Sequence, residues 1–272
     1  MPPRPTFPAR LPPAHIEPGT PGAVRGIAAS IPSMRSAAPS AISAARPAKI
    51  GVLLSEQANA RQRMVQRLRT AGIGSSAVLA ALQLVERHCF VDSAFIGQAY
   101  EDTSLPIGFG QTISKPSVVA RMATLLTEAP ITDGGRVPLG RVLEIGSGCG
   151  YQAALLARLA TEVYSIERLR GLHELARTRL RPFRVANLHL LFGDGMLGFV
   201  RGAPYAGIVS AAGGTTLPQA WIDQLAIGGR LIAPTVTQSG EQALVVVDKT
   251  ATGPRQRVLE GVHFVPLKSG IA

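Results

Sequence analysis

The stretch that decides the fold is Val142-Leu143-Glu144-Ile145-Gly146-Ser147-Gly148-Cys149-Gly150. Apolar residues on both sides of Glu144 are typical of a buried strand, and the glycines that follow are typical of a tight turn into a helix. Such a turn lets the backbone approach a ligand at the carboxyl edge of a parallel sheet, although tight turns also use glycine for structural reasons alone. The spacing is G-x-G-x-G, because Tyr151 stands where a dinucleotide-binding motif has its third glycine. The spacing therefore favours a ligand that lacks a pyrophosphate.

On both sides of this turn, short apolar runs alternate with segments of helical periodicity. The predicted strands are 141–145, 162–166, 188–192, 207–210 and 229–233, and the predicted helices between them are 151–159, 168–180 and 218–225. This alternation indicates right-handed βαβ units, and two more strands, at 242–249 and 257–265, should form an antiparallel edge. The predicted fold class is α/β, with a doubly wound, mostly parallel Rossmann-like sheet and an antiparallel C-terminal edge.

The residues before this region predict an N-terminal helical cap. Apolar residues recur at helical spacing after Ser55 and again after Ser76, and each serine is the expected N-cap of its helix. Residues 100–116 have the composition of a loop, and a further helix should begin at Pro116, since proline suits a first helical turn. Ser114 should therefore lie at or just before a helix N-terminus.

Residues 1–48 differ from the rest in composition. They hold eleven of the 21 prolines, with many alanines and serines, and too few large apolar residues to form a core. Their arginines resemble those of an organelle transit peptide, but the prolines disfavour the amphipathic helix that such a peptide needs. We expect a disordered Pro/Ala-rich tail over residues 1–48 and one domain, including the helical cap, over residues 49–272.

Composition excludes several classes of protein. No apolar run is long enough for a membrane helix, and only Cys89 and Cys149 are present, so a disulfide scaffold is excluded. Cysteine and histidine spacings match no zinc motif, and we expect no metal site. Nearly half of the net charge of +11 lies in residues 1–49 and the remaining basic residues are dispersed, so a nucleic-acid surface is not expected. The prediction is a cytoplasmic monomer without a membrane or nucleic-acid partner.

Acids follow the ends of the next two predicted strands. Glu167 lies 23 residues after Glu144, where a carboxylate can accept hydrogen bonds from both ribose hydroxyls. Asp194, in Gly193-Asp194-Gly195, follows the third strand and can accept from the exocyclic amine of adenine. Each acid alone is as often a solvated loop residue. A set of three at successive strand ends indicates an adenosyl ligand without pyrophosphate, which fits S-adenosylmethionine better than NAD.

The sequence resembles the protein-L-isoaspartate O-methyltransferase family from about Ser55 to Lys268. The motifs that carry the resemblance are Tyr100-Glu101-Asp102, Leu105-Pro106-Ile107-Gly108, Gln111-Thr112-Ile113-Ser114 with Pro116, Glu144 to Gly150, Gly193-Asp194-Gly195, Ala203-Pro204-Tyr205, Pro218-Gln219-Ala220, Gly228-Gly229-Arg230-Leu231 and Phe264-Val265-Pro266-Leu267. The Thr112-Ile113-Ser114 motif is specific to this family, whereas the glycine motif is shared by many methyltransferases.

The resemblance implies a protein-repair enzyme that uses S-adenosylmethionine to methylate the free carboxylate of L-isoaspartyl residues in damaged proteins and peptides. It implies Ser114 as the catalytic residue and Thr112 and Ile113 as the substrate loop. The expected cofactor-binding residues are Glu144, Gly146, Gly148, Gly150, Glu167, Asp194 and Gly195. Since a carboxylate is ionised at neutral pH, with a reference pKa of about 4, the reaction needs alignment and no general base.

Two residues depart from the family pattern. Phe109 stands where many bacterial relatives have histidine, and Ala206 stands where the family has an aspartate. Loss of that acid would weaken either cofactor binding or only the local structure. Two alternatives therefore stay open: a methyltransferase of the same fold that acts on a small molecule or RNA, and a cofactor-binding homologue with weakened catalysis.

Overall fold

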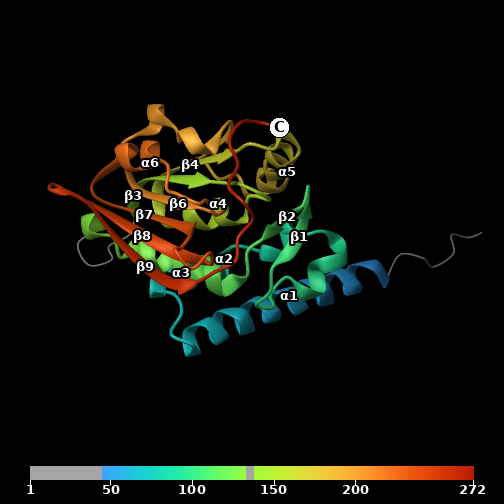
Figure 1. Cartoon of the computed structure of the whole chain (residues 1–272). Helices are drawn as coiled ribbons and strands as arrows, with labels where there is room; N and C mark the ends of the chain where they lie inside the picture. The colour runs from blue at the N-terminus through green and yellow to red at the C-terminus, as the bar shows by residue number, and fades with distance from the viewer. Residues whose placement is uncertain (1–44, 133–137) are drawn as a thin grey trace, which may run out of the picture. The chain divides into compact units, whose positions relative to one another are not determined.

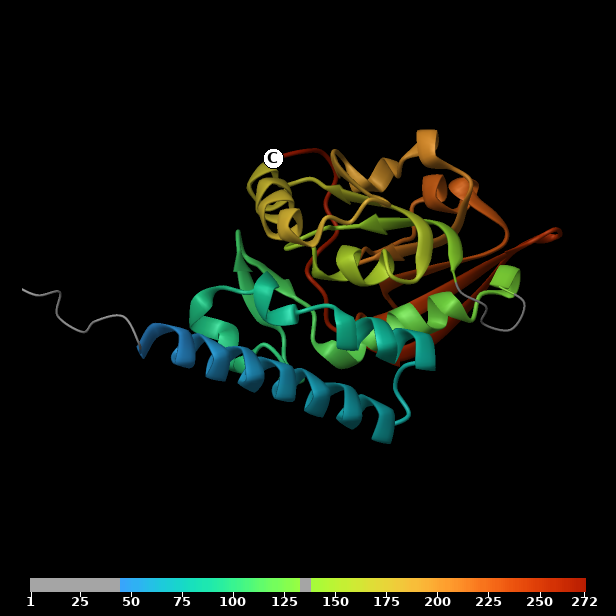
Figure 2. The ribbon, with the colours of Figure 1, turned by 180° about the vertical axis from the view of Figure 1, so that it is seen from behind.

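The computed structural model describes residues 45–132 and 138–272, which fold around a sheet of seven strands (Figures 1 and 2). The strand order is β5-β4-β3-β6-β7-β8-β9. The parallel strands are β3 (Leu139–Ile145), β4 (Ala160–Glu167), β5 (Leu188–Phe192), β6 (Tyr205–Ser210) and β7 (Leu225–Val236). The antiparallel edge consists of β8 (Gln242–Thr250) and β9 (Gly253–Gly261). The predicted fold class is confirmed.

The strand order contains one reversal of direction, and it lies beside β3. The chain leaves β3 for β4 and β5 on one side, then returns to β6 on the other side of β3. At such a switch point the connections leave the two neighbouring strands in opposite directions and open a crevice at their carboxyl ends. The glycine turn follows β3 directly, so it lies at this crevice.

Alternate residues of β3 enter two separate cores. Val142 packs with residues of α3 (Pro116–Thr127) and α4 (Tyr151–Leu156) on one face of the sheet. Leu143 packs on the other face with Trp221 of α6 (Gln219–Gln224), whose indole donates to the carbonyl of Gly195 at 2.8 Å. Because both faces are covered by helices, these strands are apolar throughout, as the sequence pattern indicates.

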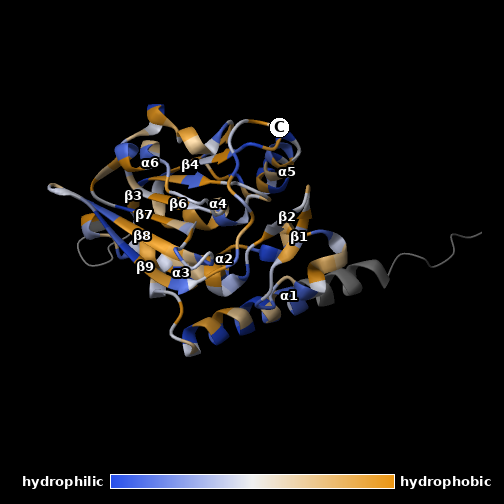
Figure 3. Ribbon diagram, in the orientation of Figure 1, coloured by the Kyte–Doolittle hydropathy of each residue, from blue (hydrophilic) through white to orange (hydrophobic). Residues whose placement is uncertain are grey.

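The helical cap shares a third core with the main domain. In the coloured part of α1 (Ala45–Thr70), from Ser55 on, hydrophobic and hydrophilic residues alternate along the helix (Figure 3), and Met64, Val65 and Leu68 are buried. This cluster also contains residues of α2 (Ser76–Leu84), α4 and α5 (Arg170–Leu180), so the cap is anchored to the helices that flank the crevice.

The N-terminal boundaries differ from the prediction. Ser55 is not an N-cap, because α1 begins ten residues earlier at Ala45, and Pro47 is tolerated in its first turn. Residues 45–48, assigned to the tail from their composition, are therefore helical, while the rest of the predicted tail lies outside the described residues. Ser75, not Ser76, caps α2, since its hydroxyl accepts from the amide of Val78 at 3.4 Å.

Two further segments differ. Residues 100–116, predicted as a loop, contain a small antiparallel hairpin of β1 (Leu105–Gly108) and β2 (Gln111–Ile113). The last strand is β9, four residues earlier than predicted, since the turn after β8 is shorter than the Thr252-Gly253-Pro254 signal indicates. Within residues 45–132 and 138–272, every helix is too short or too polar to span a membrane.

Candidate functional site

A cavity of about 410 Å³ opens at the carboxyl ends of β3, β4 and β6. Its walls come from segments far apart in the sequence: the β1–β2 hairpin, the glycine turn, the end of β4 with the start of α5, the end of β6, and residues 265–268. The lining residues are Ile107, Phe109, Gly110, Gln111, Thr112, Ile145, Gly146, Gly148, Ile166, Glu167, Arg168, Leu169, Leu172, Gly195, Ala211, Ala212, Val265, Pro266, Leu267 and Lys268. This volume is in the range that small-molecule cofactors occupy.

The glycine turn needs its glycines for conformation as well as for space. Gly146, Gly148 and Gly150 have φ angles of 90°, 54° and 89°, in the left-handed region that other residues disfavour. A Cβ at Gly150 would also lie 2.7 Å from a methyl carbon of Leu180 in α5. Gly146 and Gly148 line the cavity, whereas Gly150 is buried against α5 and holds the turn in place.

Glu167 occupies the position that the ribose prediction requires. It ends β4, lines the cavity and is 5% exposed. One carboxylate oxygen accepts from the amide of Gly148 and the other from the amide of Leu169, each at 2.9 Å. Since a carboxylate oxygen has a second lone pair, both oxygens keep acceptor capacity for a pair of neighbouring hydroxyls.

Glu144 lies behind the turn, outside the cavity wall. Its side chain is fully buried, and one oxygen accepts from the hydroxyl of Ser165, which is itself 2.6 Å from the hydroxyl of Ser147. Burial raises the pKa of the Glu144 carboxyl to about 8, because a charged carboxylate is poorly solvated there. Glu144 therefore supports the turn from beneath and does not face the ligand space.

Asp194 is engaged by the backbone on both sides. One carboxylate oxygen accepts from the amide of Met196 at 2.9 Å, and the other accepts from the amide of Gly270 at 2.6 Å. Asp194 is not part of the cavity wall, although its neighbour Gly195 is. A bond from Asp194 to an adenine amine stays a prediction, and it requires one oxygen to turn toward the cavity.

The β1–β2 hairpin places an aromatic ring at the cavity. Phe109 has φ +54°, between Gly108 and Gly110, which also have positive φ angles. Its side chain is 63% exposed and lies so close to α5 that a Cβ at Gly171 would be 2.1 Å from the ring. A histidine in this place would add polar contacts, but Phe109 contributes apolar surface to the cavity. Thr112 lines the same cavity, whereas Ile113 is buried beneath the hairpin.

Ser114 lines a second, larger groove of about 1130 Å³. Its neighbours there include Lys115, Arg121 and Glu260, and the last two form an ion pair at 2.8 Å. Residues 262–264 border this groove while residues 265–268 border the cavity, so one continuous segment is shared by both. Lys115 is the N-cap residue of α3, and Ser114 precedes it, as predicted.

Sequence reasoning missed Arg87, which binds both ends of the segment 99–114 that contains the substrate loop. Its guanidinium is fully buried and donates to the carbonyls of Ala99 and Ser114, each at 2.8 Å. It also lies over the ring of Tyr151, the first residue of α4, at 4.9 Å. Burial lowers the pKa of Arg87. In the sequence Arg87 stands between Glu86 and His88, and nothing in that pattern distinguishes a buried arginine from an exposed one.

Ala206 lies away from the cavity. It is a buried residue at the beginning of β6, where a Cβ on Gly140 would meet its methyl group at 3.2 Å. The cavity is reached only at the other end of this strand, at Ala211 and Ala212. The missing aspartate is therefore a change in the packing of the sheet and removes no group from the cavity wall.

Comparison with known proteins agrees with this geometry. The family model "Protein-L-isoaspartate(D-aspartate) O-methyltransferase (PCMT)" matches residues 59–272. The protein-L-isoaspartate O-methyltransferase of Leptothrix cholodnii is 56% identical over 228 residues, which are 83% of this chain and 79% of that protein. The enzyme of the same name from Methylibium petroleiphilum is 58% identical over 212 residues, 77% of each chain.

Solved structures show the same architecture. The structure of a protein-L-isoaspartate O-methyltransferase superposes with a TM-score of 0.69 at 26% identity and covers 78% of this chain and 67% of its own. Another, a putative enzyme of this kind from Plasmodium falciparum in complex with S-adenosyl-L-homocysteine, superposes with a TM-score of 0.67 at 22% identity, covers 76% of this chain and 98% of its own, and supports the fold alone. With the family model matching nearly all described residues and relatives more than half identical, this chain belongs to the protein-L-isoaspartate(D-aspartate) O-methyltransferase family.

Proposed function

We propose that this chain transfers a methyl group from S-adenosylmethionine to the free carboxylate of L-isoaspartyl residues in damaged proteins and peptides. One observation carries the proposal: a glycine-lined cavity with Glu167 in its wall adjoins a groove that contains Ser114, and residues 262–268 border both. A cofactor and an extended polypeptide can thus approach each other from the two sides of one segment. The two relatives that are more than half identical over the aligned residues have the name of this enzyme.

The cavity suits S-adenosylmethionine, which supplies an activated methyl group when bound. Glu167 would accept the ribose hydroxyls, and the backbone at Gly146 and Gly148 would allow close approach of the rest of the molecule. Ile166, Leu172 and other apolar side chains would contact the adenine ring. The ordered turn fits a ligand without phosphates, since the third glycine of the dinucleotide motif is replaced by the buried Tyr151.

Ser114 would orient the substrate carboxylate. Arg87 fixes the backbone of Ser114 through its carbonyl, and the twelve-residue helix α3 begins two positions later. The N-terminus of that helix favours an anion by about 0.3–1 kcal/mol. A hydroxyl donor beside it can align one carboxylate oxygen with the methyl group. Since the carboxylate is ionised already, the protein need only bind, orient and exclude water.

The experiment that tests this proposal compares an L-isoaspartyl peptide with its normal aspartyl twin as methyl acceptors. We expect methyl transfer to the isoaspartyl peptide alone. Ser114→Ala should lower the turnover about ten- to hundredfold, because a hydrogen bond to a charged group contributes about 1.5–3 kcal/mol, and cofactor affinity should stay close to wild type. Ser76→Ala, an exposed serine at the beginning of α2, is the matched control.

Two results would overturn these assignments separately. Equal methylation of both peptides would remove the substrate class. Wild-type turnover in a Ser114→Ala protein that has lost about 1 kcal/mol of stability would reduce Ser114 to a residue that supports the helix start. The monomeric state, the cytoplasmic location and the absence of membrane and nucleic-acid partners stay predictions from the sequence.

A further inference from the structure

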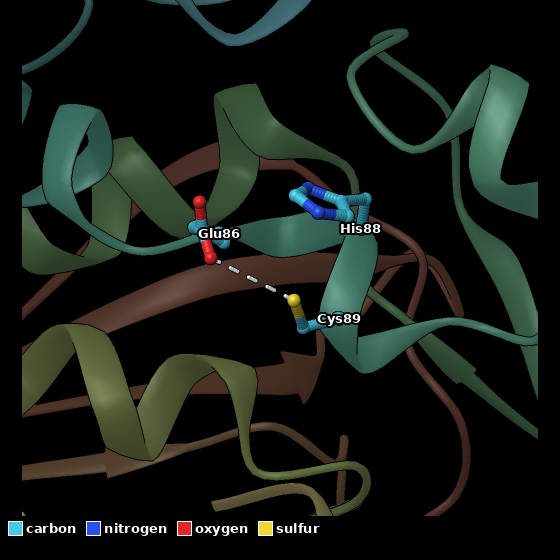
Figure 4. A group of neighbouring side chains, drawn as sticks. All are labelled: Glu86, His88 and Cys89. Carbon is cyan, nitrogen blue, oxygen red and sulfur yellow. Dashed lines mark hydrogen bonds between the residues drawn. The ribbon is translucent and has the colours of Figure 1, made fainter. Parts of the chain in front are cut away.

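A cluster of three potential metal ligands lies outside both the cavity and the groove. Glu86, His88 and Cys89 are located on and just before the short 3₁₀ helix Arg87–Phe90 (Figure 4). One ligand atom from each side chain lies within 4.8 Å of the other two. The donors are a carboxylate, an imidazole and a thiol, and the cysteine is exposed to solvent. Zinc and related thiophilic cations prefer this set of donors.

Existing contacts already hold the cluster close to a coordinating arrangement. The Sγ of Cys89 is 3.9 Å from Oε2 of Glu86, while Oε1 of Glu86 is 3.2 Å from the guanidinium of Arg61. Donor atoms around a tetrahedral zinc ion lie roughly 3.5 Å apart, so small side-chain rotations are sufficient. Glu86 can use Oε2 toward a cation and keep Oε1 on Arg61, which then orients the carboxylate.

His88 has an outer partner of the kind that metal-binding histidines have. Its Nδ1 is 2.7 Å from the hydroxyl of Tyr100. When Nδ1 carries the proton and donates to that hydroxyl, the lone pair on Nε2 is available to a metal ion. Such outer hydrogen bonds fix the ring orientation of ligating histidines.

We propose that Glu86, His88 and Cys89 bind one divalent thiophilic cation of the zinc class, with a water molecule in the fourth position. Binding deprotonates the Cys89 thiol and releases its proton to solvent. The thiolate and the carboxylate then balance the charge of the cation, and the Arg61 ion pair is retained. The spacing Glu-x-His-Cys differs from the CxxC and HExxH motifs of known zinc sites. For this reason motif spacing in the sequence predicts no metal site.

The test uses the full-length, reduced, metal-free chain. Equilibrium dialysis against Zn²⁺ measures stoichiometry and affinity, and titration with Co²⁺ reports a thiolate-to-cobalt charge-transfer band. We expect one equivalent of Zn²⁺ per chain, and a loss of affinity of at least about tenfold in both Cys89→Ser and Glu86→Gln. Two variants are the controls. Cys149→Ala removes the other thiol of the chain, and His189→Gln removes a histidine that is 3.0 Å from the carboxylate of Glu162.

Every outcome of these measurements either supports or overturns the metal site. Binding that is lost with Cys89 or Glu86 and kept in both controls supports the site. No binding by the wild-type chain, equal binding by Cys89→Ser, or a cobalt band that disappears in Cys149→Ala would overturn it. Circular dichroism of each variant confirms that the chain is folded, and because Cys89 is exposed its replacement by serine leaves the core intact.

Discussion

At the scale of single residues, acids that look alike in the sequence have different tasks. Glu167 lines the cavity with both oxygens bonded to backbone amides, whereas Glu144 is buried behind the turn next to Ser165. Their positions relative to the strand ends explain the difference. Glu144 lies inside β3, and Glu167 is the last residue of β4. Two predictions separate these tasks.

The first concerns Glu167. Replacement by alanine should weaken binding of S-adenosylhomocysteine by about 1–3 kcal/mol, because ribose hydroxyls lose their acceptor in a desolvated place. Calorimetry on wild type and variant measures this directly. Glu162→Gln is the matched control, since it changes an acid of the same strand that pairs with Arg141 outside the cavity. Unchanged affinity in Glu167→Ala would remove the ribose assignment.

The second concerns pH. Burial raises the pKa of Glu144 to about 8 from 4.5, so between these values the folded chain binds more protons than the unfolded chain. The stability that this group contributes is complete below about pH 4.5 and is lost as the pH rises toward 8. Glu144→Gln has no such titration.

The free energy of unfolding of Glu144→Gln, relative to wild type, should therefore improve as the pH rises from about 5 to about 8. Denaturant unfolding at several pH values measures this difference. A constant difference between Glu144→Gln and wild type across this window would mean that Glu144 is ionised in the folded chain.

At the scale of elements, the turn between β3 and α4 depends on its contact with α5. Gly150 has φ 89°, and an added Cβ would meet Leu180 at 2.7 Å. The turn also connects to the cap, since Tyr151 packs against Phe90 with ring centroids 5.6 Å apart. A substitution at Gly150 would therefore disturb the cavity wall, α5 and the cap together.

Gly150→Ala should destabilise the chain by more than the roughly 1–2 kcal/mol that a left-handed conformation alone costs an alanine. Gly72→Ala is the matched control, because Gly72 has φ 66° and no atom within 4 Å of an added Cβ. Thermal unfolding of both variants separates backbone strain from the clash with Leu180. Equal destabilisation would show that Leu180 moves aside without cost.

At the scale of the whole molecule, sequence predicted the sheet well because its signals are local. The apolar strands, the glycine turn and the position of Pro116 at the first turn of α3 are readable from neighbouring residues. The β1–β2 hairpin was missed, since its strands are only four and three residues long and β1 contains proline and glycine. From the sequence, the same cofactor-binding role is predicted for Glu144, Glu167 and Asp194, although their burial differs in the folded chain.

Other features depend on contacts between distant parts of the chain. The bond from Gly270 to Asp194 spans 76 residues, and the bond from Arg87 to Ser114 spans 27. The placement of Ser114 in a groove beside the cavity, with residues 262–268 between them, depends on how the last segment crosses the sheet edge. Patterns along a single sequence contain no information about such pairings.

The cavity wall is assembled from residues between Ile107 and Lys268, which lie together only in the folded chain. A ligand of this cavity therefore has little affinity for the unfolded chain and shifts the folding equilibrium by mass action, by about 2.7 kcal/mol at a concentration about one hundred times its Kd. The unfolding midpoint should rise with the logarithm of S-adenosylhomocysteine concentration, and NAD should leave it unchanged. A midpoint indifferent to S-adenosylhomocysteine would contradict the cofactor assignment. In a cell, a higher cofactor concentration would then lower the fraction of this chain that is unfolded and open to proteolysis, and the lifetime of the chain would increase with it.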